Sequence, residues 1–431
     1  MPNDPEVDGI LSGRAAILRV GIAGLAAAPA VAFRATSGEL AAPAAVLVFG
    51  TGVLAAVALL MWAAEAARAD VSGSLALAVL AVVAILPEYA VDIYFAYSAG
   101  RRPDFAAYAT ANMTGANRLL IGVAWPLLVF TAIWAIRRRR SQEPGETVGE
   151  PTGWLRGGVG MADQRRVEIL FLAAATLYAL VIPLTGRLAW YDSIALGGLF
   201  AAYLWRIRDS PDSEEELTGV AAIVAAQPRI RRRSLVVLLF AAAAVIILAS
   251  AEPFGDALVD AGTELGVDRF LLVQWLAPIA SESPEVLVAI TFALRARADD
   301  GMGALLAAKL NQWALLVACL PIAYYIGGGH LAGLPMDARQ TEEFVLTTAQ
   351  TVLGVAMLLT LRLTGAKALL LLGLFVAQFA LPDEQARYII SAVYIVVAVV
   401  FAIRYRNEVR PLLAAGSRRR SQQPLAQRRA T

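Results

Sequence analysis

Residues that build disulfides and zinc sites are almost missing from this 431-residue chain. It has one cysteine, Cys319, and one histidine, His330. A single cysteine excludes an intrachain disulfide and any cysteine-rich metal cluster. A single histidine excludes zinc sites built on several histidines. The sequence also has no nucleophile elbow and no phosphate-binding loop, so an enzyme is the weakest of the functions considered.

Charged residues are scarce as well. They make up 17% of the chain, against 58% hydrophobic residues and a mean hydropathy of +0.63. Globular proteins average about 25% charged and about 45–50% apolar residues. The apolar excess lies in repeated stretches of roughly 18–25 residues, each long enough to cross a bilayer core of about 30 Å. We therefore expect an all-α polytopic membrane protein.

About twelve transmembrane helices are predicted from these stretches. They form two halves, 15–207 and 234–408, joined by a polar cytoplasmic linker at 208–233. A cytoplasmic tail (1–14) precedes them, and a basic, disordered tail (409–431) follows. The start of the chain lacks the pattern of a cleaved signal peptide, so we expect the first helix to stay as an anchor. The spans lie near 15–34, 43–66, 72–98, 105–136, 166–186, 188–207, 234–260, 269–295, 301–326, 342–362, 366–382 and 386–407.

Clusters of lysine and arginine indicate the orientation of the spans, because loops rich in these residues stay in the cytoplasm. In a twelve-span arrangement most of them fall on one side. We therefore expect a multi-pass protein of the inner (plasma) membrane with both termini in the cytoplasm. The expected partners are the lipid bilayer and inorganic cations, without nucleic acid, and the oligomeric state is unknown. The clusters are Arg137–Arg140, Arg229–Arg233, Arg295 with Arg297, Arg362 with Lys367, and Arg404–Arg420.

Two segments of the chain resemble each other. The third span contains a Pro-Glu pair that ends at Glu88, and the eighth span contains another that ends at Glu285. Each pair is followed by a polar hinge and an apolar helix with an internal asparagine, Asn117 in one and Asn311 in the other. Spans five places apart cross the membrane in opposite directions. The hairpins, 72–136 and 268–327, are therefore predicted to form an inverted-topology repeat.

The carboxylates of these hairpins predict an ion site. A charge inside an apolar span costs roughly 2.5–3.5 kcal/mol, so Glu88 and Glu285 mark an ion or proton path. Asp92 lies four residues after Glu88, and Glu282 lies three before Glu285, so each pair shares a helix face. Closely spaced carboxylates repel one another, so proton binding would compete with cation binding, which is one route to exchange. Neutral oxygens for a cation could come from Ser281, Ser283, Thr114, Asn117 and Asn311.

The two hairpins resemble the sodium/calcium exchanger membrane region family, part of the cation/calcium antiporter superfamily. Its repeats read Gly-Thr-Ser-x-Pro-Glu on one helix and Gly-Ser-Asn on the next. The resemblance implies that Glu88 and Glu285 are the central cation ligands, that Ser281 takes the place of the family's threonine, and that Asn117 and Asn311 match its asparagine. It also implies a secondary active antiporter working by alternating access, without a cofactor, with Ca²⁺, Na⁺ or H⁺ as substrates.

The sequence departs from the family's pattern at two basic residues, at one acidic one, and at two lost ligand positions, where Leu120 and Ala314 stand in place of the family's Asn or Asp. Arg118 directly follows the first asparagine, and Lys309 replaces the glycine two residues before the second. Glu282 stands where the second repeat should have serine. A guanidinium and an ammonium beside the site would oppose a divalent cation. The two basic residues could instead neutralise Asp92 or Glu282 as buried pairs, or a lysine–carboxylate pair could exchange its internal salt bridge for a transported cation.

Two alternatives to a calcium antiporter remain open. One keeps the fold but couples protons to a monovalent cation, and it is motivated by the basic residues and the lost ligand positions. The other is a degenerate, non-transporting membrane scaffold or sensor, motivated by the same losses. The sequence alone does not choose among them.

Overall fold

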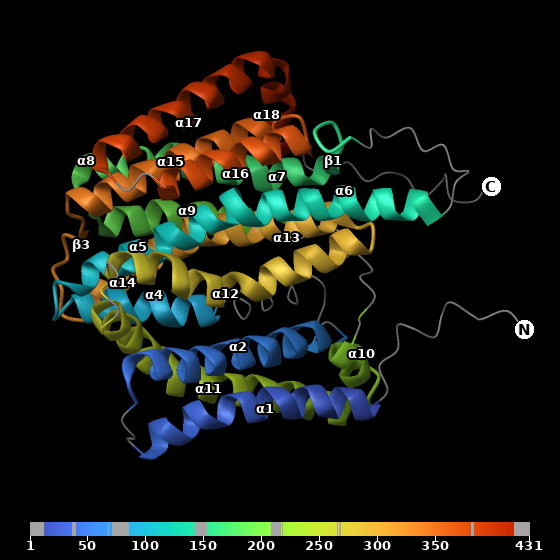
Figure 1. Ribbon diagram of the computed structural model, residues 1–431, viewed down its shortest axis with the longest axis vertical. Helices are drawn as coiled ribbons and strands as arrows, with labels where there is room; N and C mark the ends of the chain where they lie inside the picture. The colour runs from blue at the N-terminus through green and yellow to red at the C-terminus, as the bar shows by residue number, and fades with distance from the viewer. Residues whose placement is uncertain are drawn as a thin grey trace, which may run out of the picture.

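The computed structural model describes residues 13–36, 40–67, 69–70, 86–142, 153–207, 217, 219–264, 266, 269–380 and 383–417. In these ranges the chain is a bundle of helices that run side by side (Figure 1). The longer helices of the first half are α1 (Gly13–Thr36), α2 (Ala42–Ala67), α4 (Leu86–Ala99), α5 (Phe105–Leu119), α6 (Trp125–Gln142), α7 (Arg166–Ala179) and α9 (Trp190–Ile207). Those of the second half are α11 (Arg229–Glu264), α12 (Arg269–Leu294), α13 (Ala298–Asn311), α14 (Val317–Ile326), α15 (Ala338–Leu358), α16 (Gly365–Ala380) and α17 (Glu384–Arg404).

Seven of the described helical segments are long and apolar enough to cross a membrane. They include continuous segments such as Phe105–Arg139 and Ala298–Ile326. Helices α4, α12 and α15 are not among the seven, and all three carry buried acids. The polytopic all-α fold is confirmed, whereas the count of twelve and the division into halves and tails stay predictions. Part of the third predicted span, 72–85, lies outside the described residues.

Two segments expected to be irregular contain helix. In the predicted linker, α10 (Gly219–Ala225) buries Val220, Ala221 and Val224, three apolar residues that share one helix face. In the predicted disordered tail, α18 (Val409–Ser417) buries Leu412. The polar residues around both segments predicted loops. Each segment nevertheless forms a helix, because a short apolar face packs against the neighbouring helices. Residues 208–216 and 218 of the linker, 418–431 of the tail and most of the 1–14 tail lie outside the described residues, and the end of the predicted linker, from Arg229, belongs to α11.

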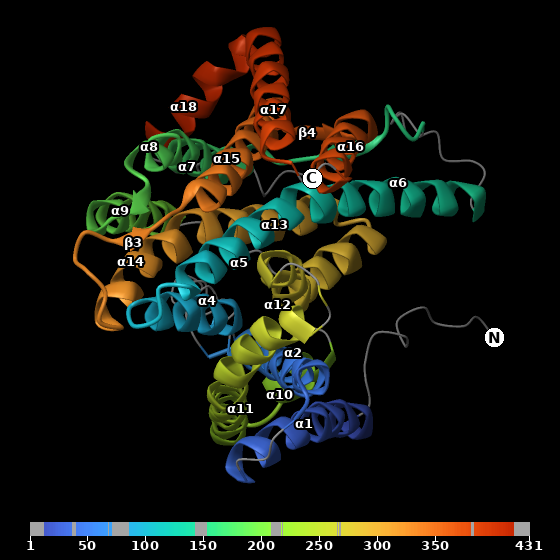
Figure 2. The same cartoon turned by 60° about the vertical axis from the view of Figure 1, so that its left-hand side comes forward.

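The helices form two apolar cores. One core joins α1, α2, α10 and α11 through small and branched side chains such as Ala63 and Ile246. The larger core extends through the other helices and contains Trp125 and Trp313. In Figures 1 and 2, α4, α5, α12 and α13 lie between the α1–α2–α11 group and the group formed by α7, α9, α15 and α17. The two predicted hairpins therefore occupy the middle of the molecule.

Two short antiparallel strand pairs connect the halves. β1 (Gly158–Gly160) pairs with β4 (Arg362–Thr364), and β2 (Arg187–Leu188) pairs with β3 (Leu334–Pro335). β1 and β3 each precede the first long helix after the hairpin of their half, α7 or α15, while β2 and β4 each precede the next long helix, α9 or α16. Exchanging the two halves therefore turns one pair into the other. The labels β1 and β3 lie at opposite ends of the bundle in Figure 1, as an inverted repeat requires.

A second sign of the repeat is a π-helical turn in each hairpin. The turn η2 (Leu120–Ala124) joins α5 to α6, and η4 (Gln312–Leu316) joins α13 to α14. Single π-helical turns inside long helices occur frequently at functional sites. Both turns follow directly on the segments that hold the two asparagines. The repeat therefore extends from the sequence to a local distortion of the backbone.

Helix α5 approaches α12 at backbone distance. A Cβ atom added at Gly115 would lie 1.7 Å from the carbonyl oxygen of Gln274, so no side chain fits there. Glu282 lies two turns further along α12 from this crossing. The glycine therefore fixes the helix that carries two of the predicted ligands against the helix that carries Asn117.

The basic helix ends gather at one end of the bundle. Arg139 donates a hydrogen bond to the carbonyl oxygen of Leu294 at 3.0 Å, and Arg206 donates one to the carbonyl oxygen of Ala415 at 3.1 Å. Arg165 Nε lies 3.3 Å from Asp299 Oδ1 at the start of α13. These contacts bring the ends of α6, α9 and α12 together with the starts of α7 and α13, as the arginine pattern predicted.

Candidate cation site

Four carboxylates predicted from the sequence come together between α4 and α12. Glu88 and Asp92 lie on α4, with exposed fractions of 8% and 0%, and Glu282 on α12 is 4% exposed. Glu285, one turn further along α12, is partly buried. Glu88 is close enough to the other three to be repelled electrostatically by each of them. The two Pro-Glu helices therefore contribute to one acidic site.

Each hairpin holds one of its own acids with a side-chain amide. Asn112 on α5 donates a hydrogen bond from Nδ2 to Asp92 Oδ1 at 2.7 Å. Gln312 in η4 donates one from Nε2 to Glu282 Oε1 at 2.5 Å. Neither amide was predicted from the sequence, although an amide in an apolar span is a signal that could have found them. They orient one carboxylate in each repeat.

Each of the four acids keeps one buried oxygen with no hydrogen-bond partner among the described residues: Glu88 Oε1, Asp92 Oδ2, Glu282 Oε2 and Glu285 Oε2. Unpartnered buried carboxylate oxygens are costly unless a cation or a proton compensates them. Within the described part of the chain no three acidic, cysteine or histidine side chains are already arranged to hold a metal ion. A bound cation therefore needs further oxygens, or a movement of the helices that brings the carboxylates closer.

Lys309 on α13 reaches the opposite hairpin. Its Nζ donates a hydrogen bond to Asn117 Oδ1 at 2.5 Å and lies 3.4 Å from the Asn117 carbonyl oxygen. The Trp313 ring lies beneath the ammonium, with Nζ 4.5 Å from the ring centroid. Burial disfavours the charged form of Lys309, whereas Glu282 and Glu88 favour it, and none of the ion pairs found among the described side chains includes Lys309. The expected lysine–carboxylate contact is therefore replaced by contacts with neutral oxygens.

The asparagines and Ser281 complete the predicted set. Asn117 donates from Nδ2 to the carbonyl oxygen of Met113 at 2.8 Å, so both ends of its amide are engaged. Asn311 Oδ1 accepts a hydrogen bond from the Tyr89 hydroxyl at 3.3 Å. The structure thus places both asparagines beside the acids but gives their oxygens protein partners. The side chain of Ser281 lies outside the described residues.

Arg118 pairs with a different acid, so the pairing with Asp92 or Glu282, one of the alternatives that the sequence left open, is not formed. Its Nη2 lies 2.6 Å from Glu343 Oε2 on α15, and the guanidinium lies 4.9 Å from the Trp275 ring centroid. One residue of α-helix rotates the side chain by about 100°, which turns Arg118 away from the direction of Asn117. Glu343 was missed because two adjacent acids at the start of a predicted span resemble a solvated helix end.

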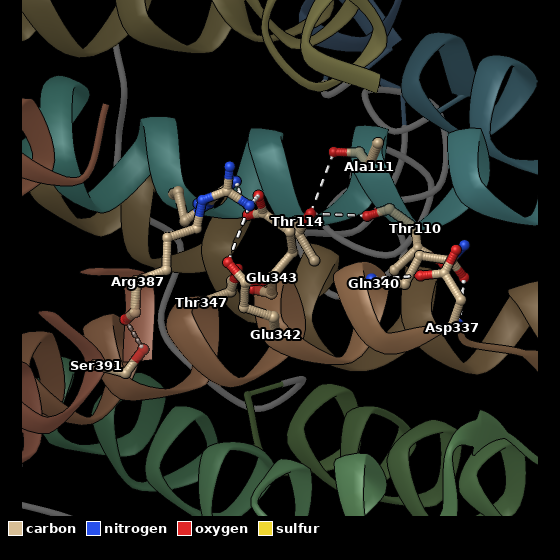
Figure 3. A network of polar contacts seen from close by, with 11 residues as sticks. Thr110, Ala111, Thr114, Asp337, Gln340, Glu342, Glu343, Thr347, Arg387 and Ser391 are labelled. Carbon is tan, nitrogen blue, oxygen red and sulfur yellow. Dashed lines mark hydrogen bonds and ion pairs between the residues drawn. The ribbon is translucent and has the colours of Figure 1, made fainter. Parts of the chain in front are cut away.

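Arg118 belongs to a second buried cluster, here called the arginine–glutamate network. It consists of Arg118 on α5, Glu342 and Glu343 on α15, and Arg387 on α17. Arg387 Nη1 lies 2.9 Å from Glu342 Oε1 and 3.0 Å from Glu343 Oε1. Figure 3 shows Arg387 pointing toward the two glutamates. The network has two positive and two negative groups, so it is balanced without any added ion.

Comparisons with known proteins agree with this architecture. The sequence profile of the family described as sodium/calcium exchanger protein matches residues 41–207 and 235–382. Helices α1 and α17 lie outside the matched residues. A comparison with curated proteins gives no match.

Solved exchanger structures share the fold. The crystal structure of the H⁺/Ca²⁺ exchanger CAX is 38% identical in sequence, covers 94% of this chain and 98% of its own, and has a TM-score of 0.86. The Ca²⁺/H⁺ antiporter YfkE is 14% identical, with coverage of 89% and 100% and a TM-score of 0.55. The sodium-calcium exchanger NCX_Mj is 17% identical, with coverage of 80% and 99% and a TM-score of 0.50.

The last two likenesses concern the fold alone. The family match extends over most of the chain, and the two strand pairs and the two π-helical turns repeat between the halves. This chain belongs to the sodium/calcium exchanger family.

Proposed function

We propose that this chain is a secondary active antiporter that exchanges Ca²⁺ for protons through the four-carboxylate site. The observation that carries the proposal is the set of four acids, each with an unpartnered buried oxygen. Oxygen atoms of carboxylates are the ligands that Ca²⁺ prefers. The name of the 38% identical solved structure, an H⁺/Ca²⁺ exchanger, supports the choice of the two ions.

Mutual exclusion of the two ions follows from burial. Four charged carboxylates cannot stay together in an apolar bundle, because each repels the others and none is well hydrated. Either a divalent cation or protons must compensate them. Loading the site with one ion therefore releases the other, which is the requirement for coupled exchange.

The inverted repeat supports alternating access to this site. α4 and α12 carry the acids at equivalent places in oppositely directed hairpins, so the site lies between two similar halves. A rocking movement of one half against the other would open the site to each side of the membrane in turn. The bilayer and inorganic cations are the only partners that this mechanism needs, and it uses no cofactor.

Flux measurements test the proposal. Reconstituted protein should take up Ca²⁺ when the vesicle interior is acidic, and Glu285→Gln should abolish the uptake. Asp163→Asn is the matched control, because the Asp163 side chain is 87% exposed and far along the chain from the site. Calcium flux that needs a sodium gradient would show that Na⁺, and not H⁺, is the ion exchanged for Ca²⁺. Proton-driven flux of a monovalent cation without calcium flux would replace the proposal, and no flux at all would favour a scaffold.

We also propose that the end of the bundle bearing the basic clusters faces the cytoplasm, with the protein in the plasma membrane. The support is the gathering of Arg139, Arg165 and Arg206 at one end. In a Cys319→Ser background, Arg139→Cys should react with an impermeant maleimide only in inverted vesicles. His330→Cys, at an exposed position of the opposite end, should react in intact cells. The reverse pattern would overturn the orientation.

A further inference from the structure

We propose that the Lys309 ammonium is a built-in cation that occupies one cation position between the two hairpins. Without the lysine, a free monovalent ion would be needed at that position. The inference rests on the proposed function, since it assigns the lysine a place among the transported ions. It concerns the occupant of the site and the number of ions needed to balance it.

The first step is the nature of its ligands. The Lys309 side chain is fully buried, with 0% exposure, and Nζ is its one polar atom. The described contacts of Nζ are the two oxygens of Asn117 and the face of the Trp313 ring. Neutral amide oxygens and an aromatic face are a coordination shell that suits a monovalent cation. A lysine buried for structural reasons is normally paired with a carboxylate at contact distance.

The second step is the position of the ammonium. It bridges α13 of one hairpin to Asn117 of the other, while Glu282 and Glu88 attract it from beyond contact distance. Gln312, three residues further along the same helical segment, holds Glu282 by one oxygen and leaves the other oxygen unpartnered. In its protonated form the lysine therefore reduces the negative charge of the site without using up the free carboxylate oxygens.

The third step is the difference between the repeats. At the corresponding place in the first hairpin, two residues before the asparagine, the chain has Gly115, which packs against the backbone of α12. In the second hairpin the same place extends a full cationic side chain to the centre of the molecule. At this matched position the second hairpin supplies a positive charge and the first does not, so the site binds one positive charge fewer than four carboxylates alone would need.

Chemical replacement of the lysine tests the inference. Lys309→Ala removes the ammonium and leaves space, so K⁺ or methylammonium should raise the melting temperature of the purified full-length variant in a saturable way. The wild-type protein should show no such dependence on monovalent cations. Lys309→Met, which keeps most of the side-chain volume without the charge, should not respond. Lys309→Ser is the second choice if the alanine variant does not fold.

The ligand shell provides a further control. Adding Asn117→Ala to Lys309→Ala should abolish the response to K⁺, because the two positions share one cation site. Equal melting temperatures of Lys309→Ala with and without K⁺ and methylammonium would overturn the inference, as would an equal response of Lys309→Met. These measurements need no calcium transport, so they stay informative if the proposed exchange of Ca²⁺ for protons fails.

Discussion

The molecule has two buried clusters of charge that differ in their balance. The candidate cation site brings four carboxylates toward one ammonium, which makes no contact ion pair with the described side chains. The arginine–glutamate network joins two arginines and two glutamates through ion pairs of 2.6–3.0 Å. Both clusters are enclosed by the same helical bundle, so burial alone does not explain the difference. The unbalanced cluster lies in the hairpins, whereas the balanced one connects α5, α15 and α17.

This contrast separates two uses of buried charge. A balanced network can stay closed, because each group is compensated by its neighbours. An unbalanced site keeps a reason to bind ions from outside, since its oxygens lack partners. The arginine that the sequence placed beside the site therefore belongs to the scaffold, and the lysine belongs to the site.

The largest expected effect distinguishes the clusters by function. Glu88→Gln should lower cation flux below about 1% of the wild-type rate, since even partners outside a metal's ligand shell change affinity by about 10–100-fold. Its melting temperature in detergent should equal or exceed that of the wild type, because one repulsive charge is removed. Flux in vesicles and thermal unfolding measure the two effects. A Glu88→Gln protein that unfolds readily would make the acidic site a structural element instead.

The second effect is on stability. Glu343→Gln should lower the free energy of unfolding by about 3–5 kcal/mol, because Arg118 loses the carboxylate 2.6 Å away while staying buried. The double variant Arg118→Met with Glu343→Leu should recover most of that loss, since apolar side chains of similar volume can replace a buried pair. Denaturant unfolding in detergent measures both. A double variant no better than the single one would show that the network acts through more than charge balance.

A smaller effect tests how firmly the site helix is held. Gly115→Ala places a Cβ atom 1.7 Å from the carbonyl oxygen of Gln274, so α5 and α12 must move apart. We expect a loss of about 1–3 kcal/mol of stability, typical of overpacking, together with slower flux. Gly198→Ala, where nothing lies within 4 Å of the added atom, is the matched control. Equal stability of the two variants would contradict the close crossing.

The smallest effect concerns an ion pair outside the bundle's interior. The Arg232 guanidinium donates to both Asp70 oxygens at 2.7 Å and lowers the pKa of Asp70 from its usual 3.8 to about 2. A lowered folded-state pKa contributes stability above the unfolded pKa, and that contribution is lost as the pH falls from about 4 toward 2. The difference in melting temperature between wild type and Asp70→Asn should therefore be constant from pH 7 to about 5 and narrow below about 4. A difference unchanged by acid would show that the pair does not act through charge.

The fold could be predicted from the sequence more completely than the side-chain contacts could. Apolar stretches and the repeated Pro-Glu pairs indicated an inverted-repeat membrane protein, because hydropathy and helix direction follow from local sequence. The convergence of Glu88, Asp92, Glu282 and Glu285 also followed from helical spacing. The partner of Arg118 did not, because Glu343 comes from a helix more than two hundred residues away and only packing decides which faces meet.

The two amides that were not predicted also show that packing geometry decides the contacts, here between residues close together in the sequence. Asn112 and Gln312 lie within a few residues of the two asparagines that the family pattern selected. A sequence pattern indicates which residues are polar in an apolar helix, but the backbone geometry decides which of them faces the acids. The π-helical turn that begins at Gln312 changes the direction of the side chains locally, and no residue type in the sequence predicts this turn.

The crossed strand pairs set an order in which the chain can be completed. β1 is made early, but its partner β4 begins only at Arg362, about two hundred residues later. At a synthesis rate of about 5–20 residues per second, β1 waits roughly 10–40 s for its partner. The first half is therefore made before the strand that pairs with β1 exists. Because β2 likewise needs β3, neither half can form these strand pairs without the other.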